Sequence, residues 1–335
     1  MAVSATAPTR RHGPWVRWAR LAITVGLMAV LLTKFDADEL LPSDRSLPGT
    51  LAFLIGGIVL MAGSFVLASW RWQRVLAVFG AAVPMPTLIK HYLAGQFVGN
   101  ALPSTVGGDV LRVSRLARDT GSREIAFASV VIERLTGFFA LPVLTFLGFL
   151  IRPDLLEKGR SWIAVAIAGG ALLILAIIVV VAASPRLAGR FKDHENWMRY
   201  IGIVHVGIDR LRRDPRDAWA ALGAALAYQA TVVASVYCAV HTIGLDTLPN
   251  AAVLAFVPAV AMVQVLPISI FGGLGVREAM LALLLHPLGV PTAQAIAVGL
   301  LWYAMTLIVS LAAAPAFVMG HREEQEEVVP PPKSP

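Results

Sequence analysis

Hydrophobic residues along the chain gather in long runs that short polar segments separate. A helix needs about 20 mostly apolar residues to cross the roughly 30 Å hydrocarbon core of a bilayer. Six runs are long enough and are predicted to be transmembrane helices: 15–35, 51–72, 124–151, 161–183, 218–243 and 292–319. Because the first run has no small-residue cleavage pattern at its end, we interpret it as a retained span rather than a signal peptide.

Two further apolar regions, 84–122 and 251–289, are interrupted by proline and by a Gly-Gly pair. Proline ends a helix, and glycine permits a tight turn with positive φ. Unwound backbone at membrane depth must be buried in protein or line a wet cavity. Each region is therefore predicted to be a re-entrant helical hairpin, which enters and leaves the membrane on one side. A pair of ordinary spans with an interfacial helix is the alternative.

The two interrupted regions carry the same motif. Leu102–Arg112 and Leu266–Arg277 both contain Leu-Pro, a serine, Gly-Gly and then an arginine. Each half of the chain also has the order span, span, hairpin, span, and three crossings place the second half upside down relative to the first. Inverted repeats are typical of transporters, in which broken helices of both halves form the substrate site near the midplane.

We therefore predict an all-α polytopic membrane protein with six full spans plus two re-entrant helical hairpins in an inverted-topology repeat. Repeat A covers 15–151 and repeat B covers 161–319, within one transmembrane domain at 15–319. The segment 1–14 is predicted to be a cytoplasmic tail. The acidic and then proline-rich segment 320–335 is predicted to be a disordered cytoplasmic tail.

Composition and charge agree with this prediction. Hydrophobic residues make up 57% of the chain and charged residues 15%, against about 45–50% and about 25% in soluble proteins. The single cysteine excludes a disulfide and a cysteine-based zinc site. The net charge is +7, and most lysine and arginine residues fall in loops on one predicted side, which indicates cytoplasmic termini rather than a nucleic-acid partner. The basic segment 184–217 is predicted to lie along the inner leaflet.

The motif itself predicts an anion site. If the second half of each hairpin begins at its glycine pair, Gly107–Gly108 or Gly272–Gly273, its free N–H groups and positive dipole end face the interior. Arg112 and Arg277 each add a full charge one turn later. A phosphate or phosphodiester is the natural ligand. The alternative is that the glycine pairs only let helices pack closely.

Charged residues at membrane depth are the other candidates, because a charge at the bilayer centre costs about 2.5–3.5 kcal/mol. We expect Glu133 to neutralise a hairpin arginine and Arg134 to meet the ligand or Asp109; a purely structural ion pair is the alternative. Arg71 and Arg74 are predicted to belong to an interfacial belt at the end of span 51–72, and contact of Arg71 with head groups is the alternative. The candidate head-group residues are Arg112, Arg277, Gly107, Gly108, Gly272, Gly273, Arg134, Glu133, Asp109, Glu278, Gln96, Asn100, Ser104 and Ser269. The scattered histidines and the lack of a Walker loop predict no metal, no cofactor and no ATP on this chain.

The segment from Gln96 to Arg112, the Glu133–Arg134 pair and the segment from Leu266 to Glu278 resemble one bacterial family. It is the flippase-like family that includes the transmembrane domain of lysylphosphatidylglycerol synthetases, the multiple peptide resistance factor proteins. The resemblance implies a multi-pass protein of the bacterial inner membrane that moves lipids between leaflets. No aminoacyl-transferase module follows the last predicted span, so lysyl transfer is not implied.

The expected function is therefore that of a translocator, or flippase, of a phospholipid or other anionic lipid-linked substrate, and not that of an enzyme. Membrane lipids are the expected partners, while a homodimer or a partner membrane enzyme stays open. The alternative is a membrane-embedded enzyme or accessory subunit for polyprenyl-phosphate-linked sugar or glycolipid synthesis, which would depend on Asp36, Asp38 or Glu133.

Overall fold

The computed structural model describes residues 47–101, 105–184, 186, 199–264 and 273–311, and the regular elements within these ranges are helices. Five of them are long and apolar enough to cross a membrane: α3 (Leu47–Val78), α6 (Arg123–Ile151), α7 (Ser161–Ala183), α9 (Pro215–Thr242) and α12 (Thr292–Leu311). They confirm five of the six predicted spans. The predicted span 15–35 and both predicted tails lie outside the described residues.

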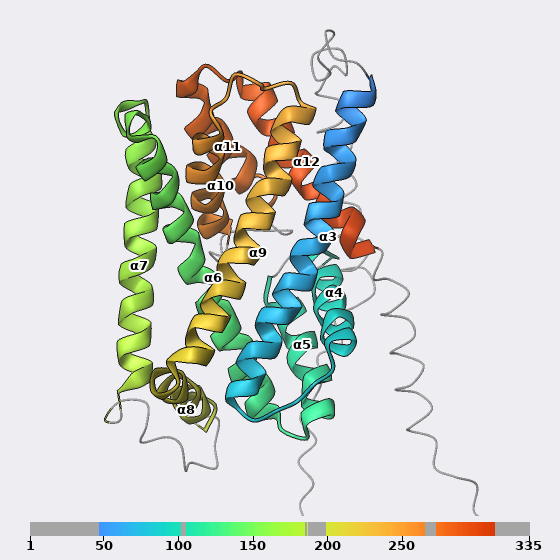
Figure 1. The fold of residues 1–335 in the computed structure, drawn as a ribbon, viewed down its shortest axis with the longest axis vertical. Coiled ribbons are helices and arrows are strands. Elements are labelled where there is room, and N and C mark those ends of the chain that lie inside the picture. Colours follow the sequence, from blue (N-terminus) through green and yellow to red (C-terminus); the bar gives the residue numbers. More distant parts are fainter. Residues whose placement is uncertain (1–46, 102–104, 185, 187–198, 265–272, 312–335) are drawn as a thin grey trace, which may run out of the picture.

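Four shorter helices occupy the two interrupted regions: α4 (Met85–Ala101), α5 (Thr105–Thr120), α10 (Asn250–Gln264) and α11 (Val276–Leu285). At about 1.5 Å per residue, none of them is as long as the roughly 30 Å bilayer core. α4 packs against α5, and α10 packs against α11. Figure 1 shows the first pair in the lower half of the bundle and the second pair in the upper half. This arrangement is the one expected of two hairpins that enter from opposite faces; their re-entrant path through a membrane stays a prediction.

Contacts between helices recur in equivalent pairs when α3, α4, α5 and α6 are exchanged for α9, α10, α11 and α12. α3 packs against its own equivalent, α9. The contact of α5 with α6 recurs as that of α11 with α12, and the contact of α6 with α10 recurs as that of α12 with α4. Such pairing is expected of two related halves facing one another, which is the arrangement that the repeated motif predicts.

Helix α8 (Arg199–Arg213) lies at the lower end of the bundle and packs on α6 and α7 (Figure 1). Its Arg210 donates from Nη1 to the Val78 carbonyl at 3.0 Å and so satisfies the end of α3. Asp214 then caps α9 by accepting from the Arg216 amide at 3.1 Å. The basic helix lies in the segment predicted to be interfacial. Two short 3₁₀ turns, η1 (Pro153–Glu157) and η4 (His286–Leu288), complete the described elements.

The glycine pairs differ from the prediction in the first half of the chain. Gly107 and Gly108 lie inside α5, which begins at Thr105, so the predicted turn at this pair is wrong. Gly108 instead lets two helices touch, because a Cβ there would lie 2.3 Å from the Gly95 carbonyl oxygen of α4. The close-packing alternative holds for this residue.

In the second half, backbone conformation requires glycine as predicted. Gly273 has φ +97° and Gly275 has φ +85°, a region that other residues rarely adopt. Helix α11 begins directly afterwards, at Val276. Gly272 lies outside the described residues.

Candidate functional site

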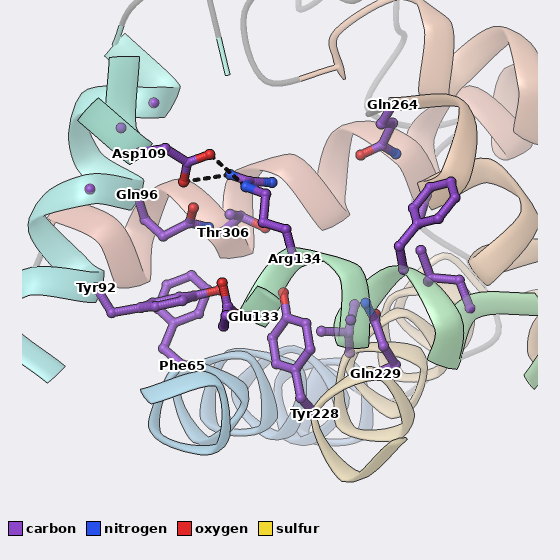
Figure 2. Close-up of a pocket in the computed structure, with 18 of the residues that line it drawn as sticks. Phe65, Tyr92, Gln96, Asp109, Glu133, Arg134, Tyr228, Gln229, Gln264 and Thr306 are labelled. Carbon is purple, nitrogen blue, oxygen red and sulfur yellow. Dashed lines mark hydrogen bonds and ion pairs between the residues drawn. The ribbon is translucent and has the colours of Figure 1, made fainter. Parts of the chain in front are cut away.

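A cavity of about 480 Å³ lies inside the bundle and takes its walls from both halves of the chain. Figure 2 shows side chains of several helices directed toward it, including Tyr92, Arg134 and Tyr228. Its polar wall contains eight of the predicted site residues: Gln96, Asn100, Gly108, Asp109, Arg112, Glu133, Arg134 and Arg277. Gly107, Gly273 and Glu278 do not line it, and Gly272, Ser104 and Ser269 lie outside the described residues.

Glu133 of α6 is the centre of a buried ion-pair cluster. Its Oε1 pairs with Nη2 of Arg71 from α3, and its Oε2 accepts from Nη1 and Nη2 of Arg112 from α5, each at 3.2 Å. The side chains of Glu133, Arg71 and Arg112 are only 1%, 5% and 5% exposed. The prediction that Glu133 neutralises a hairpin arginine is confirmed, and three helices are joined at this carboxylate.

Aromatic rings pack against the two guanidinium groups of this cluster. The Arg112 guanidinium lies 4.2 Å from the Trp72 ring centroid and 4.6 Å from that of Tyr92. The Arg71 guanidinium lies 4.8 Å from the Tyr228 ring. Cation–π contacts of this kind strengthen when they are desolvated. The rings therefore fix both arginines against the cavity wall.

Asp109 and Arg134 form a second ion pair at the cavity, across α5 and α6 (Figure 2). Nε of Arg134 lies 2.5 Å from Oδ2 of Asp109, and Nη2 lies 2.8 Å from Oδ1. The prediction allowed Arg134 to meet Asp109, and it does. Its side chain is 45% exposed although it lies near the middle of α6, because it borders the cavity. Of these arginines, Arg134 is the most accessible to a ligand.

The second half of the chain supplies Arg277 in the first turn of α11. Nε and Nη2 of Arg277 donate to Oε1 of the neighbouring Glu278 at 3.1 and 2.9 Å. Its guanidinium also lies 5.4 Å from the Trp302 ring and 5.1 Å from the Tyr303 ring of α12. Oε2 of Glu278 accepts from the Gly275 amide at 2.6 Å. The protein's own carboxylate therefore occupies part of the predicted anion site at this helix terminus.

The structure buries Arg71 in the cluster at the cavity, so the interfacial belt is wrong for this residue, while the alternative that it meets a head group stays a prediction. The reason is the length of α3, which continues to Val78 and places Arg71 about two turns inside the helix end. Tyr92, Tyr228, Gln229 and Thr306 also line the cavity without having been predicted. The signal available in the sequence was an arginine between two tryptophans, Trp70 and Trp72, at the end of an apolar run. Among the described residues, no group of three His, Cys, Asp or Glu could hold a metal ion.

The fold and its cavity define a multi-pass helical membrane protein with an arginine-rich internal site. The family model of the lysylphosphatidylglycerol synthase TM region matches residues 17–314, so the chain belongs to this family. The match confirms the resemblance seen in the motifs, and it relates the domain to lipid modification or translocation. A comparison of the chain with the curated proteins gives no match.

Proposed function

We propose that the protein is a translocator of an anionic, phosphate-bearing lipid across the bacterial inner membrane. The observation that carries the proposal is the cavity of about 480 Å³, which four arginines from both halves of the chain line: Arg71, Arg112, Arg134 and Arg277. Small-molecule sites commonly have volumes of about 300–1,000 Å³. The cavity suits a lipid head group, while the acyl chains stay in the bilayer.

The four arginines have different roles in the proposed site, because their side chains differ in exposure. Arg134 presents the most accessible guanidinium and makes the first contact with a phosphate. Arg112 and Arg71 are anchored by Glu133 and keep a positive potential at the wall. Arg277 extends this potential into the second half of the chain. A binding surface shared by two halves lets the head group be passed between them when the halves alternate in closing.

The enzymatic alternative gains less support from the same residues. Both oxygens of Glu133 accept hydrogen bonds from arginines, and pairing with two positive charges favours the ionised carboxylate, which makes it a poor base. Asp36 and Asp38 lie outside the described residues. We therefore propose transport rather than catalysis, with membrane lipids as the partners of the chain.

The proposal is tested by reconstituting the full chain in liposomes that contain fluorescent phosphatidylglycerol. Addition of dithionite to the outside measures how fast the labelled lipid changes leaflet. Arg134→Gln is the variant to use, because it leaves the Glu133 cluster intact. A charge-assisted hydrogen bond contributes about 1.5–3 kcal/mol, so the rate should fall roughly tenfold or more.

Arg74→Gln provides a matched control. Arg74 lies on the exposed side of α3, one turn from the cluster, and stacks on Trp70 at 5.6 Å without lining the cavity. Its rate should stay within about twofold of wild type. Equal rates for wild type, Arg134→Gln and protein-free liposomes would contradict the proposal.

A further inference from the structure

We infer that the acyl chains of the transported lipid leave the cavity sideways, between α7 and α9, along an apolar path that passes Ile174 and Ile178 of α7. The inference rests on the proposed function, and it adds a chain-binding surface to the head-group site. The cavity has the volume of a small-molecule site, so the long hydrocarbon chains of a bound lipid must extend beyond it. Because hydrocarbon avoids polar surroundings, these chains require an apolar exit into the bilayer.

Ile174 and Ile178 connect the cavity with the outer surface of the bundle. Both line the cavity, and they are 56% and 42% exposed. Among the cavity-lining residues that the structure describes, these two are the large hydrophobic residues that are also exposed at the surface. Apolar lining residues of other helices, such as Met61, Leu141 and Val232, are buried. The apolar opening of the cavity therefore lies beside α7.

The position of the two isoleucines on α7 distinguishes them from residues that only face the bilayer. Helix α7 packs against α6 and α10. Its buried apolar residues recur every three or four positions and form one stripe: Ala164, Ala168, Ala171 and Leu175. Ile174 and Ile178 are one turn apart at the edge of this stripe. Ile177 lies farther round the helix, is 55% exposed and does not line the cavity. Contact with the cavity is therefore limited to one edge of α7.

Helix α6 joins this edge to the charged wall of the cavity. It packs against both α7 and α9, and Figure 1 shows it between these two helices. Phe138 lines the cavity one turn after Arg134, so its ring and the guanidinium lie on the same side of α6. Val232 of α9 lines the same cavity. A phosphate at Arg134 would therefore have apolar side chains beside it, as the junction between a head group and its acyl chains requires.

The opening lies at the depth of the hydrocarbon core. Helix α7 has 23 residues and is apolar enough to cross a membrane. At about 1.5 Å per residue, Ile178 and Ile174 lie roughly 8 and 14 Å from the end of the helix at Ala183. At this depth the bilayer contains acyl chains rather than head groups. The occupant that fits is the acyl chain of the lipid in the cavity, because the apolar surface is continuous with the head-group site.

Photo-crosslinking tests this path without requiring transport. The photoreactive residue p-benzoylphenylalanine is placed at position 178, or at position 177 as the control, and the full chain is reconstituted with fluorescent phosphatidylglycerol. Arg134→Gln removes a charge-assisted contact with the head group, so labelling at position 178 should fall at least about fivefold. Labelling at position 177, which reports the surrounding bilayer, should be the same with and without this substitution.

A bulky side chain should obstruct the path. Ile178→Trp enlarges an exposed side chain, so it should leave the core intact and lower the leaflet exchange of phosphatidylglycerol at least about fivefold. Ile177→Trp makes the same change on the side that faces only the bilayer, and its rate should equal that of wild type. Ile178→Ala widens the path and gives a second measurement if the tryptophan variant is unstable: its rate should equal or exceed that of wild type.

The outcomes separate this inference from the proposed function. If Arg134→Gln changes labelling at positions 178 and 177 equally, the lipid beside α7 is surrounding bilayer lipid and the inference is overturned. Equal exchange rates for Ile178→Trp and Ile177→Trp, or a slower rate for Ile178→Ala, would also overturn it, while translocation stands. If wild type exchanges no more lipid than protein-free liposomes but labelling at position 178 depends on Arg134, the proposed function fails and the chain-binding surface stands.

Discussion

The Glu133 cluster makes a quantitative prediction about stability. Glu133→Gln keeps the shape of the side chain but removes the charge that two buried arginines share. Removing one partner of a buried ion pair costs about 3–5 kcal/mol, because the remaining charge is left uncompensated. In a chain of a few hundred residues, 1 kcal/mol corresponds to roughly 2–4 °C in Tm. The variant should therefore unfold at least about 6 °C below wild type.

The single cysteine of the chain supplies the assay. Cys238 lies half-buried in α9, so a dye that fluoresces on reaction with thiols reports unfolding of the detergent-solubilised protein. Glu157→Gln, at an exposed carboxylate of η1, is the control and should leave Tm within about 1 °C. A Tm for Glu133→Gln equal to that of the control would refute the reasoning.

A double variant separates the charge from the shape. Arg71→Gln alone leaves Glu133 paired with Arg112, so it should cost less than Glu133→Gln. Adding Arg71→Gln to Glu133→Gln removes one of the two unpaired arginines and should recover part of the lost Tm. Additive losses in the double variant would show that the arginine and the carboxylate do not interact.

Two more predictions concern packing and topology. Gly108→Ala should lower stability by about 1–3 kcal/mol through overpacking of α4 against α5, whereas Gly63→Ala, with no atom within 4 Å of its new Cβ, should be neutral or slightly stabilising in the same Tm assay. In a Cys238→Ala background, cysteines introduced at the exposed positions Ala82 and Pro291 should be labelled by an impermeant maleimide from opposite sides of the membrane; labelling of both from one side would contradict the inverted arrangement.

Much of the architecture could be predicted because a bilayer imposes simple requirements on a sequence. Helix length and hydropathy located the five described spans, and the repeated Leu-Pro and Gly-Gly motif located both pairs of short helices. Glu133 was predicted to meet a hairpin arginine because an ionised side chain inside an apolar span needs a partner. These inferences use only local patterns and the cost of burying charge.

The remaining features depend on tertiary contacts that local patterns do not record. A glycine pair is compatible both with a turn and with close helix packing, and contact with Gly95 decides the outcome for Gly108. Arg71 could lie at an interface or in the interior, depending on whether α3 ends near it or continues for two more turns. The sequence pattern alone therefore determines neither the role of the glycine pair nor the position of Arg71.

The two copies of the motif show that the same limit on sequence-based prediction applies to the partners of the site arginines. Arg112 and Arg277 occupy the same motif position, yet Arg112 pairs with a carboxylate from the next span and Arg277 with its own neighbour, Glu278. Glu133 is the eleventh residue of α6, and the eleventh residue of α12 is Trp302, whose ring stacks beside Arg277. The following span therefore supplies a charge in one half and an aromatic ring in the other. A repeated motif predicts where each arginine lies, but the partner that neutralises it is determined by residues outside the motif.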